Sequence, residues 1–168
     1  MPAKSTKKSG LPAGATVVAS NRRARHDFAI LDTYEAGLVL KGSEVKSLRE
    51  GKVQLVDAYA RPDKGELWLH GVHIAPWAFA HGFGAVDPDR SRKLLLHRHE
   101  IDEISARMGQ ERLTLVPLTI FFLDGVAKVE LGLAKGRKTE DRRQVIAERD
   151  VARETARYLG RSRKGMID

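Results

Sequence analysis

Clustered arginines and lysines are the residues in this sequence whose types and spacing could do chemistry. In the last third of the chain arginine recurs at every fourth position, at Arg149, Arg153, Arg157 and Arg161. Four residues advance an α-helix by about 400°, so this row stays near one helical face. Guanidinium groups bind phosphate oxygens bidentately, and the row therefore indicates a nucleic-acid partner. A solvated helix with Asp150 and Glu154 paired to arginines also fits the spacing.

Further basic clusters occur at the predicted ends of strands and helices. They are Arg22-Arg23-Ala24-Arg25-His26, Arg90-Ser91-Arg92-Lys93, Lys135-Gly136-Arg137-Lys138 and the pair Arg142-Arg143. The flat ring of His26 could stack on a base. Gly136 would let the backbone approach a phosphate closely. Several such clusters on one small domain favour a nucleic-acid surface.

The charge is concentrated at the two ends of the chain. The net charge is +8 and the pI is about 9.9. Residues 1–25 carry six Lys/Arg and no acids, and residues 135–168 carry eleven Lys/Arg against six acids. The segment between them has a net charge of −3. This distribution predicts a compact domain with polycationic ends that release counterions when they meet phosphate.

Other classes of function find little support in the composition. The chain has no cysteine, which excludes disulfides, thiolate metal sites and cysteine nucleophiles. It has no apolar run of about 20 residues and no secretory signal, so we expect a cytoplasmic protein without a membrane segment. No motif demands catalysis, and we predict no catalytic residue, metal or cofactor. One competing hypothesis remains, a metal-dependent nuclease that uses His97, His99 and Asp57.

The elements that must position the basic clusters begin with a short strand over residues 17–19. Asn21 is a predicted N-cap for a helix over residues 22–26, and a long strand follows over residues 28–40. Gly37 is a possible bulge in that strand. The next helix is predicted to be capped by Ser43 and ended by Gly51.

The second half of the sequence predicts more strands than helices. The turn Asp63-Lys64-Gly65 leads into a strand over residues 67–74, and a loop over 79–91 precedes a strand over 93–97. Ile101, Ile104 and Met108 mark a helix ended by Gly109. Asp124-Gly125 predicts a hairpin of strands 113–123 and 126–134, with a bulge or edge at Pro117. Everything after Thr139 is predicted helical, fading after Gly160.

This order of elements favours a mostly β fold. We predict a small closed antiparallel β-barrel with peripheral short helices and a basic C-terminal tail. The predicted divisions are a disordered basic N-terminal arm over 1–15, an RNA-binding β-barrel domain over 16–138 and a basic C-terminal tail over 139–168. The tail is expected to be loose in solution and helical when bound.

Several segments resemble one known family, and they occur in the same order as in that family. They are Asn21–Asp27, Tyr34–Gly37, Gly42–Arg49, Asp87–Leu96, Lys128–Lys138 and Asp141–Arg143. In these segments the sequence is similar to the bacterial SsrA-binding protein family, also called small protein B. Ser43 and Glu140 depart from residues often seen in relatives, and the resemblance is weak after Tyr158.

The resemblance implies an oligonucleotide-binding-like (OB-like) barrel and a role in trans-translation. Family members bind the tRNA-like domain of transfer-messenger RNA (tmRNA) and deliver it to stalled ribosomes, without catalysis of their own. The predicted partners are thus tmRNA and the decoding centre and mRNA channel of a stalled ribosome, and the free protein is predicted to be a monomer. A general single-strand RNA-binding barrel protein remains an alternative.

The resemblance and the basic clusters together give two sets of candidate residues. The predicted RNA-binding residues are Asn21, Arg22, Arg23, Arg25, Glu35, Arg90, Arg92, Lys93 and Leu95. By the resemblance, Asn21, Glu35 and Leu95 contact the elbow of the tRNA-like domain. The predicted ribosome-facing residues are His26, Lys135, Gly136, Arg137, Lys138, Arg142, Arg143, Arg149, Arg153 and Arg157.

Overall fold

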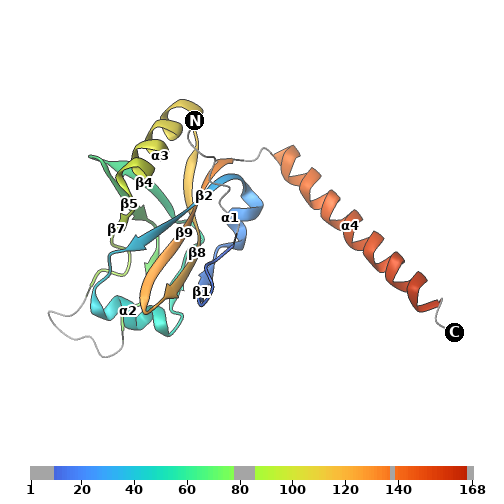
Figure 1. Cartoon of the computed structure of the whole chain (residues 1–168), viewed down its shortest axis with the longest axis horizontal. Helices are drawn as coiled ribbons and strands as arrows, with labels where there is room; N and C mark the ends of the chain where they lie inside the picture. The colour runs from blue at the N-terminus through green and yellow to red at the C-terminus, as the bar shows by residue number, and fades with distance from the viewer. Residues whose placement is uncertain (1–9, 78–85, 137–138, 166–168) are drawn as a thin grey trace. The chain divides into compact units, whose positions relative to one another are not determined.

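The chain forms two compact units, Met1–Gly136 and Arg137–Asp168. The computed structural model describes residues 10–77, 86–136 and 139–165 (Figure 1). Side chains are described for these residues except 139–145 and 161–165. The first unit contains all the strands and three helices of the described chain. The second contains a single helix, α4 (Thr139–Gly165).

Antiparallel strands make up most of the first unit, which confirms the prediction of a mostly β fold. Seven strands pair in the order β1-β8-β4-β5-β7-β2-β9, and β8 also pairs with β9. That last pairing joins six strands into a ring. The strands are β1 (Thr16–Ser20), β2 (Phe28–Leu38), β4 (Tyr59–Asp63), β5 (Glu66–His70), β7 (Arg92–Leu95), β8 (Thr114–Leu123) and β9 (Val126–Gly136). A separate two-stranded sheet pairs β3 (Val53–Gln54) with β6 (His73–Ile74).

The main core lies inside the ring. Strand residues alternate between its two faces, and most inward positions are aliphatic, such as the fully buried Leu67, Leu115 and Leu131. Leu48 of α2 (Gly42–Arg49) and Ile104 of α3 (Arg98–Glu111) belong to the same cluster. These two helices therefore contribute to the core at the periphery of the sheet.

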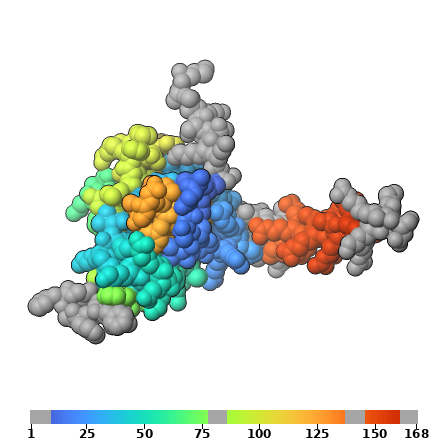
Figure 2. All heavy atoms as spheres, turned by 60° about the horizontal axis from the view of Figure 1, so that its bottom comes forward, coloured from blue at the N-terminus to red at the C-terminus, as the bar shows by residue number. Residues whose placement is uncertain are grey.

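A second, smaller apolar cluster lies under α1 (Arg22–Asp27), where Ala24 is buried. Ala24 packs with Val116, Leu118 and Ala134 of the β8–β9 pair. This contact holds the short helix against the sheet, although six residues are too few for a stable helix alone. In Figure 2 the β8–β9 hairpin (orange) lies beside β1 (blue), which pairs with β8.

Local sequence signals for caps and turns are confirmed at three positions. The Asn21 Oδ1 atom accepts a hydrogen bond from the Ala24 N–H at 3.1 Å, so Asn21 caps α1. Asp124 and Gly125 both have positive φ, as a two-residue hairpin turn with the right-handed strand twist requires. The β8–β9 register shifts between Pro117 and Thr119, which places a bulge at the proline.

Two local predictions in the first half of the chain are wrong. Helix α2 begins two residues earlier than predicted, and its N-cap is Lys41 rather than Ser43; the Lys41 N–H donates to the Glu44 Oε1 atom at 3.0 Å. The bulge in β2 falls between Ile30 and Asp32 rather than at Gly37. Gly37 is instead in register opposite Leu95, and a Cβ atom at this glycine would lie 3.3 Å from the Leu95 Cβ atom.

In the rest of the chain, two glycines predicted to end helices do not end them, and a third divides a predicted strand. Helix α3 continues past Gly109 to Glu111 and ends at Arg112, which adopts a left-handed conformation. Helix α4 continues past Gly160 to Gly165. The predicted strand over 67–74 is divided into β5 and β6 at Gly71, where φ is +75° and the Asp57 carbonyl oxygen would lie 2.9 Å from a Cβ atom.

Candidate nucleic-acid interface

An open groove of about 740 Å³ lies on the outer face of the first unit, where β2, β7 and β9 meet. Two of the predicted RNA-binding residues, Glu35 and Leu95, line it together. The other lining residues are Gly10, Leu11, Pro12, Thr33, Tyr34, Gly37, Leu96, His97, Glu100, Phe121, Lys128 and Glu130. Gly10–Pro12 thus border the groove, within the stretch predicted to be a disordered arm.

Strand pairing explains why Glu35 and Leu95 share the groove. Leu95 is opposite Gly37, and Glu35 lies two residues before Gly37 on the same face of β2. Because Gly37 has no side chain, Leu95 can lie close to β2 while remaining 53% exposed. A large apolar side chain and a carboxylate are therefore both open to a ligand.

A pair of glutamates crosses the floor of the groove. Glu35 of β2 is directly opposite Glu130 of β9, an arrangement of like charges that is unfavourable on its own. Each carboxylate has a basic partner. The Lys128 Nζ atom donates to the Glu35 Oε1 atom at 2.6 Å, and the Arg25 Nη2 atom donates to the Glu130 Oε1 atom at 3.3 Å. Arg25 therefore connects α1 with the groove.

Helix α1 presents its basic residues to solvent. Arg22, Arg23 and Arg25 are exposed, whereas Ala24 is buried beneath them. The Arg23 Nε atom lies 3.4 Å from the Asp27 Oδ2 atom, and the His26 Nδ1 atom lies 3.1 Å from the Asp27 Oδ1 atom. The predicted basic cluster of residues 22–26 is thus a surface next to the groove.

Asn21, which is predicted to contact RNA, is buried beside that surface in this structure. It is 4% exposed, and its side chain is fully engaged within the protein. The Nδ2 group donates to the carbonyl oxygens of Leu55 (3.1 Å) and Pro117 (3.2 Å), while Oδ1 caps α1. Asn21 therefore fixes the position of α1, because a buried amide with three hydrogen bonds has little capacity for another partner.

The end of β9 lies next to the end of α1. Phe28, which follows α1, is opposite Gly136, and Ala29 is opposite Lys135. His26 is thus brought near Lys135 and Gly136 within the first unit, and all three were predicted to face the ribosome. Arg137 and Lys138 fall outside the residues described, as do the side chains of Arg142 and Arg143. Arg149, Arg153 and Arg157 are exposed on α4.

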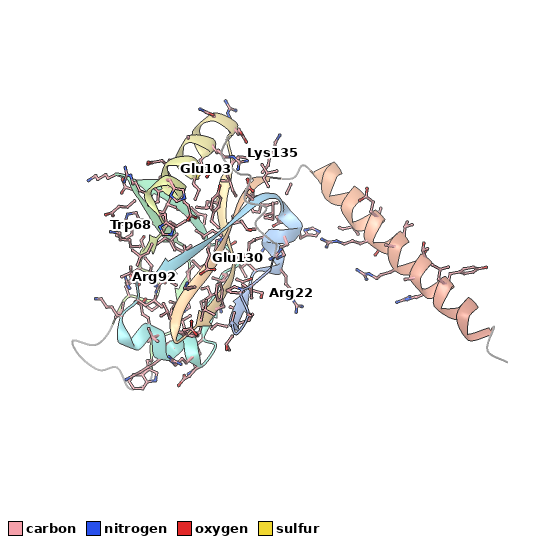
Figure 3. All side chains as sticks on the ribbon, in the orientation of Figure 1. Arg22, Trp68, Arg92, Glu103, Glu130 and Lys135 are labelled. Atoms are coloured by element: carbon pink, nitrogen blue, oxygen red, sulfur yellow. The ribbon has the colours of Figure 1, made fainter. Side chains whose placement is uncertain are left out.

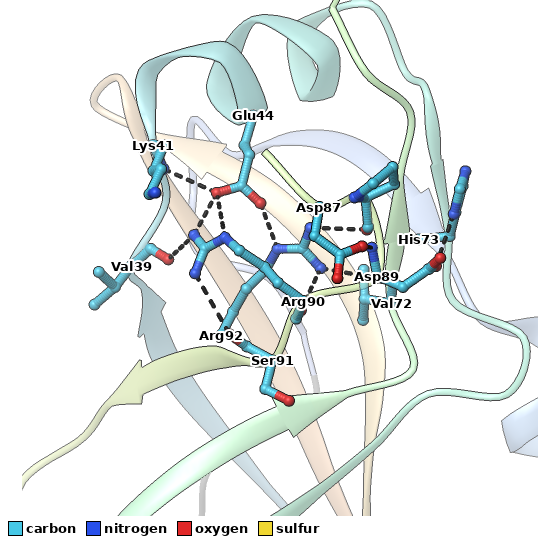
Figure 4. A network of polar contacts seen from close by, with 11 residues as sticks. Val39, Lys41, Glu44, Val72, His73, Asp87, Asp89, Arg90, Ser91 and Arg92 are labelled. Atoms are coloured by element: carbon cyan, nitrogen blue, oxygen red, sulfur yellow. Dashed lines mark hydrogen bonds and ion pairs between the residues drawn. The ribbon is translucent and has the colours of Figure 1, made fainter. Parts of the chain in front are cut away.

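Arg90 and Arg92 both form ion pairs with the buried Glu44 (Figure 4). The Arg92 Nε atom donates to the Glu44 Oε2 atom at 2.6 Å, and the Arg90 Nε atom donates to the Glu44 Oε1 atom at 3.0 Å. Arg92 also donates to the carbonyl oxygens of Val72 (2.7 Å), Pro88 (3.0 Å) and Arg90 (3.0 Å). The network joins α2, the 86–91 loop and β7.

The guanidinium group of Arg92, a predicted RNA-binding residue, is directed into the protein in this structure. Its side chain is 0% exposed, and its guanidinium group is bound on all sides by protein oxygens. Arg90 is partly exposed at the edge of the same network and also donates to the Val39 carbonyl oxygen. Lys93 lies outside the network on the outer face of β7, where its Nζ atom donates to the Glu66 Oε1 atom at 2.9 Å.

Glu44 stays ionised despite its burial. Desolvation alone would raise the pKa of this carboxyl, but hydrogen bonds from Arg90, the Lys41 N–H and Arg92 outweigh it and lower the pKa. A buried carboxylate between two guanidinium groups is fully compensated, so the network can stabilise the loop that precedes β7.

The histidines do not assemble a metal site in the part of the chain that the structure describes. The rings of His97 and His99 stack on each other, with centroids 5.6 Å apart. No group of three or more His, Asp or Glu side chains suited to a metal ion occurs among those residues. The nuclease hypothesis thus gains no support there. No helix of the described chain is long and apolar enough to cross a membrane.

The strand register reveals residues of the groove that sequence reasoning missed. Lys128 and Glu130 lie on β9, opposite Gly37 and Glu35 respectively. Their alternation with the buried Val129 and Leu131 marks them as outward-facing, but only the β2–β9 pairing shows that they meet Glu35. Pairing between strands about 95 residues apart cannot be read from local patterns.

Comparison with known proteins gives a single consistent result. A family model described as SmpB protein matches residues 18–161. The SsrA-binding protein of Salinispora arenicola is 56% identical over 155 residues, which cover 92% of this chain and 97% of the relative. The SsrA-binding protein of Mycolicibacterium smegmatis is 55% identical over 163 residues, which cover 96% of this chain and 99% of the relative.

The fold has a counterpart among solved structures. A chain of the structure described as "tmRNA-SmpB: a journey to the center of the bacterial ribosome" is 51% identical, with a TM-score of 0.62. The match covers 76% of this chain and 93% of that chain. The family match, the relatives and the structural neighbour all agree with the resemblance of the sequence motifs. This chain belongs to the SmpB protein family.

Proposed function

We propose that this protein binds the tRNA-like domain of tmRNA and delivers it to stalled ribosomes for rescue and peptide tagging. The names of its relatives describe SsrA-binding proteins, and its structural neighbour is a tmRNA-SmpB structure of the bacterial ribosome. The observation that carries the proposal is the shared groove, in which Glu35 and the exposed Leu95 lie side by side next to the arginines of α1.

The groove offers three kinds of contact that structured RNA can use. Glu35 can accept hydrogen bonds from base amino groups or 2′-hydroxyls, in exchange for its bond to Lys128. Leu95 supplies an apolar surface for an unstacked base. Lys128, once released from Glu35, becomes available to a phosphate, so binding costs no unpaired charge.

The basic residues take different roles within this proposal. Arg22, Arg23 and Arg25 neutralise phosphates and orient the RNA without reading its sequence. Arg90 and Lys93 border the surface at either end of the buried Arg92. Asn21 and Arg92, which are also predicted to bind RNA, hold α1 and β7 in place.

We further propose that the strand ring of residues 16–138 acts as an OB-like RNA-binding barrel and that residues 139–168 form a ribosome-directed tail. Lys135 and Gly136 lie just before the point where the two regions join in sequence, and the pairing of Phe28 with Gly136 brings His26 near them. Positive charge for ribosomal RNA comes from Lys135, Arg137, Lys138, Arg142, Arg143, Arg149, Arg153 and Arg157, while His26 and Gly136 face the ribosome beside them. Catalysis of peptide transfer stays with the ribosome, the free protein acts as a monomer and the site of action is the cytoplasm.

Replacement of Glu35 tests the groove directly. We expect Glu35→Ala to weaken binding of the tRNA-like domain by about 1–3 kcal/mol, because a base or ribose donor loses its acceptor. Filter-binding titration at fixed salt gives the affinity. Glu50→Ala, which removes an exposed carboxylate paired only with Lys52 in the described structure, is the matched control. Equal affinities for Glu35→Ala and the unmodified protein would refute the assignment of this groove.

A further inference from the structure

The outer face of β4, β5 and β7 carries a row of aromatic and basic side chains, of which only Lys93 takes part in the proposed function. The strand register places Tyr59 opposite His70, Arg61 opposite Trp68, and Trp68 opposite Lys93. Side chains directly opposite each other on one face lie about 5 Å apart at their Cβ atoms. Three rings and two cations are therefore gathered on neighbouring strands.

These side chains point away from the core. Leu67 and Leu69 alternate with Trp68 along β5 and are fully buried, as is Leu94 beside Lys93 on β7. Trp68 and His70 are partly exposed, and Tyr59 is 41% exposed. Figure 3 labels Trp68 among the strands β4, β5 and β7. The indole ring is thus available on the outer surface.

Two of the rings already form a stack. The Tyr59 and His70 centroids are 5.4 Å apart, with 25° between the ring planes. The Ser91 Oγ atom lies 2.8 Å from the His70 Nδ1 atom and orients the imidazole. Burial and the nearby charge of Arg61 lower the pKa of His70, which favours the neutral imidazole. A flat, neutral and fixed pair of rings is suited to extend its stack onto a base.

The charges on this face select the kind of nucleic acid. Arg61 is exposed and forms no ion pair with any residue that the structure describes. Lys93 is partly neutralised by Glu66, and Asp63 lies opposite Glu66 at the end of the same face. Two cations against two acids give no dense positive surface for the paired phosphates of a duplex. Stacking on rings, with one cation for one phosphate, matches unpaired nucleotides instead.

The face is continuous with the groove. Leu95 lies two residues beyond Lys93 on the same outward face of β7 and lines the groove. We propose that the outer face of β4, β5 and β7 is a stacking platform that binds unpaired bases of a single-stranded RNA segment, with Arg61 on a phosphate. This inference rests on the proposed function, since the groove would receive the structured part of the same RNA.

Trp68 can report on its own binding site. The sequence has two tryptophans, and the other, Trp77, lies away from this face under the Lys46 side chain. In a Trp77→Phe protein all tryptophan fluorescence comes from Trp68. We expect an unstructured 12-nucleotide RNA to quench this fluorescence on binding, because a base stacks on the indole. A Trp68→Phe protein, which retains Trp77, is the control and is expected to keep its fluorescence.

Substitution of the stacking ring tests the energetics. We expect Tyr59→Ala and Arg61→Ala to weaken binding of the 12-nucleotide RNA, by about five- to a hundred-fold for the tyrosine. Tyr158→Ala removes an exposed tyrosine from α4 and is the matched control, with unchanged affinity expected. Far-ultraviolet circular dichroism verifies that each variant is folded. Binding that Tyr59→Ala leaves unchanged, or that Tyr158→Ala weakens instead, would overturn the proposal.

A second RNA separates this inference from the proposed function. Glu35→Ala is expected to weaken binding of the tRNA-like domain more than binding of the 12-nucleotide RNA. Tyr59→Ala is expected to weaken binding of the 12-nucleotide RNA more than binding of the tRNA-like domain. If Glu35→Ala leaves binding of the tRNA-like domain unchanged while Tyr59→Ala weakens binding of the 12-nucleotide RNA, the stacking platform is supported and the assignment of the groove is refuted. If bound oligonucleotide leaves Trp68 fluorescence unchanged, the platform falls and the groove assignment is untouched.

Discussion

At the scale of single residues, the structure separates basic side chains that support the fold from those that can meet RNA. Arg90-Ser91-Arg92-Lys93 is one cluster in the sequence, yet its members have different surroundings. Arg92 is enclosed and Arg90 is anchored to Glu44, whereas Lys93 reaches the outer face. Glu44 causes this division, because a buried carboxylate draws in both neighbouring guanidinium groups.

Glu44 makes the stability of the protein sensitive to acid. Its pKa in the folded state is lowered from the ordinary value of 4.5, so its contribution is fully present above that value. The contribution is lost as the pH falls through the folded pKa, since protonation breaks the pairs with Arg90 and Arg92. We expect Glu44→Gln to cost on the order of 3 kcal/mol near neutral pH and to flatten the acid dependence. Urea denaturation at several pH values measures both effects, and Glu50→Gln serves as the control. An acid profile that Glu44→Gln leaves unaltered would contradict this account.

Tyr34 has the opposite dependence, at alkaline pH. Burial, followed by the negative charges of Glu103 and Asp32, raises its pKa to about 12, although a hydrogen bond from Arg107 works against this rise. Because the folded pKa lies above the ordinary value of 10.0, the neutral phenol stabilises the fold fully below pH 10. This contribution is lost between about pH 10 and 12. An ultraviolet absorbance titration is expected to show a late tyrosine ionisation that Tyr34→Phe removes. Persistence of that late step in the variant would show that another tyrosine is responsible.

At the scale of helices and strands, the sequence predicts the caps, turns and bulges that depend on neighbouring residues. The Asn21 cap, the Asp124-Gly125 turn and the bulge at Pro117 each depend on one or two residues and are visible in the sequence. The positions of Arg92 and Glu35 depend on partners 48 and 93 residues away, Glu44 and Lys128. Periodicity carries no information on such pairings. The resemblance to a family supplied Glu35 and Leu95, but the groove that joins them required the strand register.

Gly71 and Gly109 also differ in their structural roles, and one substitution at each glycine tests this difference. Gly71 separates β5 from β6 with a φ of +75° and would place a Cβ atom 2.9 Å from the Asp57 carbonyl oxygen. We expect Gly71→Ala to destabilise the protein by about 1–3 kcal/mol. Gly109 lies inside α3 with no atom near its missing Cβ, so Gly109→Ala is expected to stabilise it by about 0.5–1 kcal/mol. Midpoints of urea denaturation give both values. A loss of stability at Gly109 or none at Gly71 would contradict the boundary assigned to each glycine.

At the scale of the whole molecule, the charge distribution and the two compact units suggest a division of labour. The first unit, Met1–Gly136, contains the groove, the arginines of α1 and the outer face of β4, β5 and β7. The second, Arg137–Asp168, contributes a helix whose described side chains, residues 146–160, are all exposed. Apolar residues such as Ile146, Val151 and Leu159 are among them. A helix with this many uncovered apolar groups is expected to gain its stability from a partner.

Removal of residues 139–168 tests whether the two functions are separable. The deleted segment has eight Lys/Arg and six Asp/Glu, so it removes only +2 of the net charge of +8. The long-range attraction to RNA is therefore nearly preserved, and the groove is intact. We expect the truncated protein to bind the tRNA-like domain with an affinity within a few-fold of the full chain. Peptide tagging on ribosomes stalled without a stop codon is expected to be abolished in reconstituted translation.

The result depends on comparing the two measurements on the same preparations. Glu35→Ala in the full chain is the complementary variant, because it lowers affinity while leaving α4 in place. Its tagging is expected to recover when the concentrations of protein and tmRNA are raised above the weakened dissociation constant. Tagging by the truncated protein is not expected to recover, since saturation with RNA cannot replace the missing ribosome contacts. Parallel loss of affinity and tagging on truncation would show instead that α4 is part of the binding site for tmRNA.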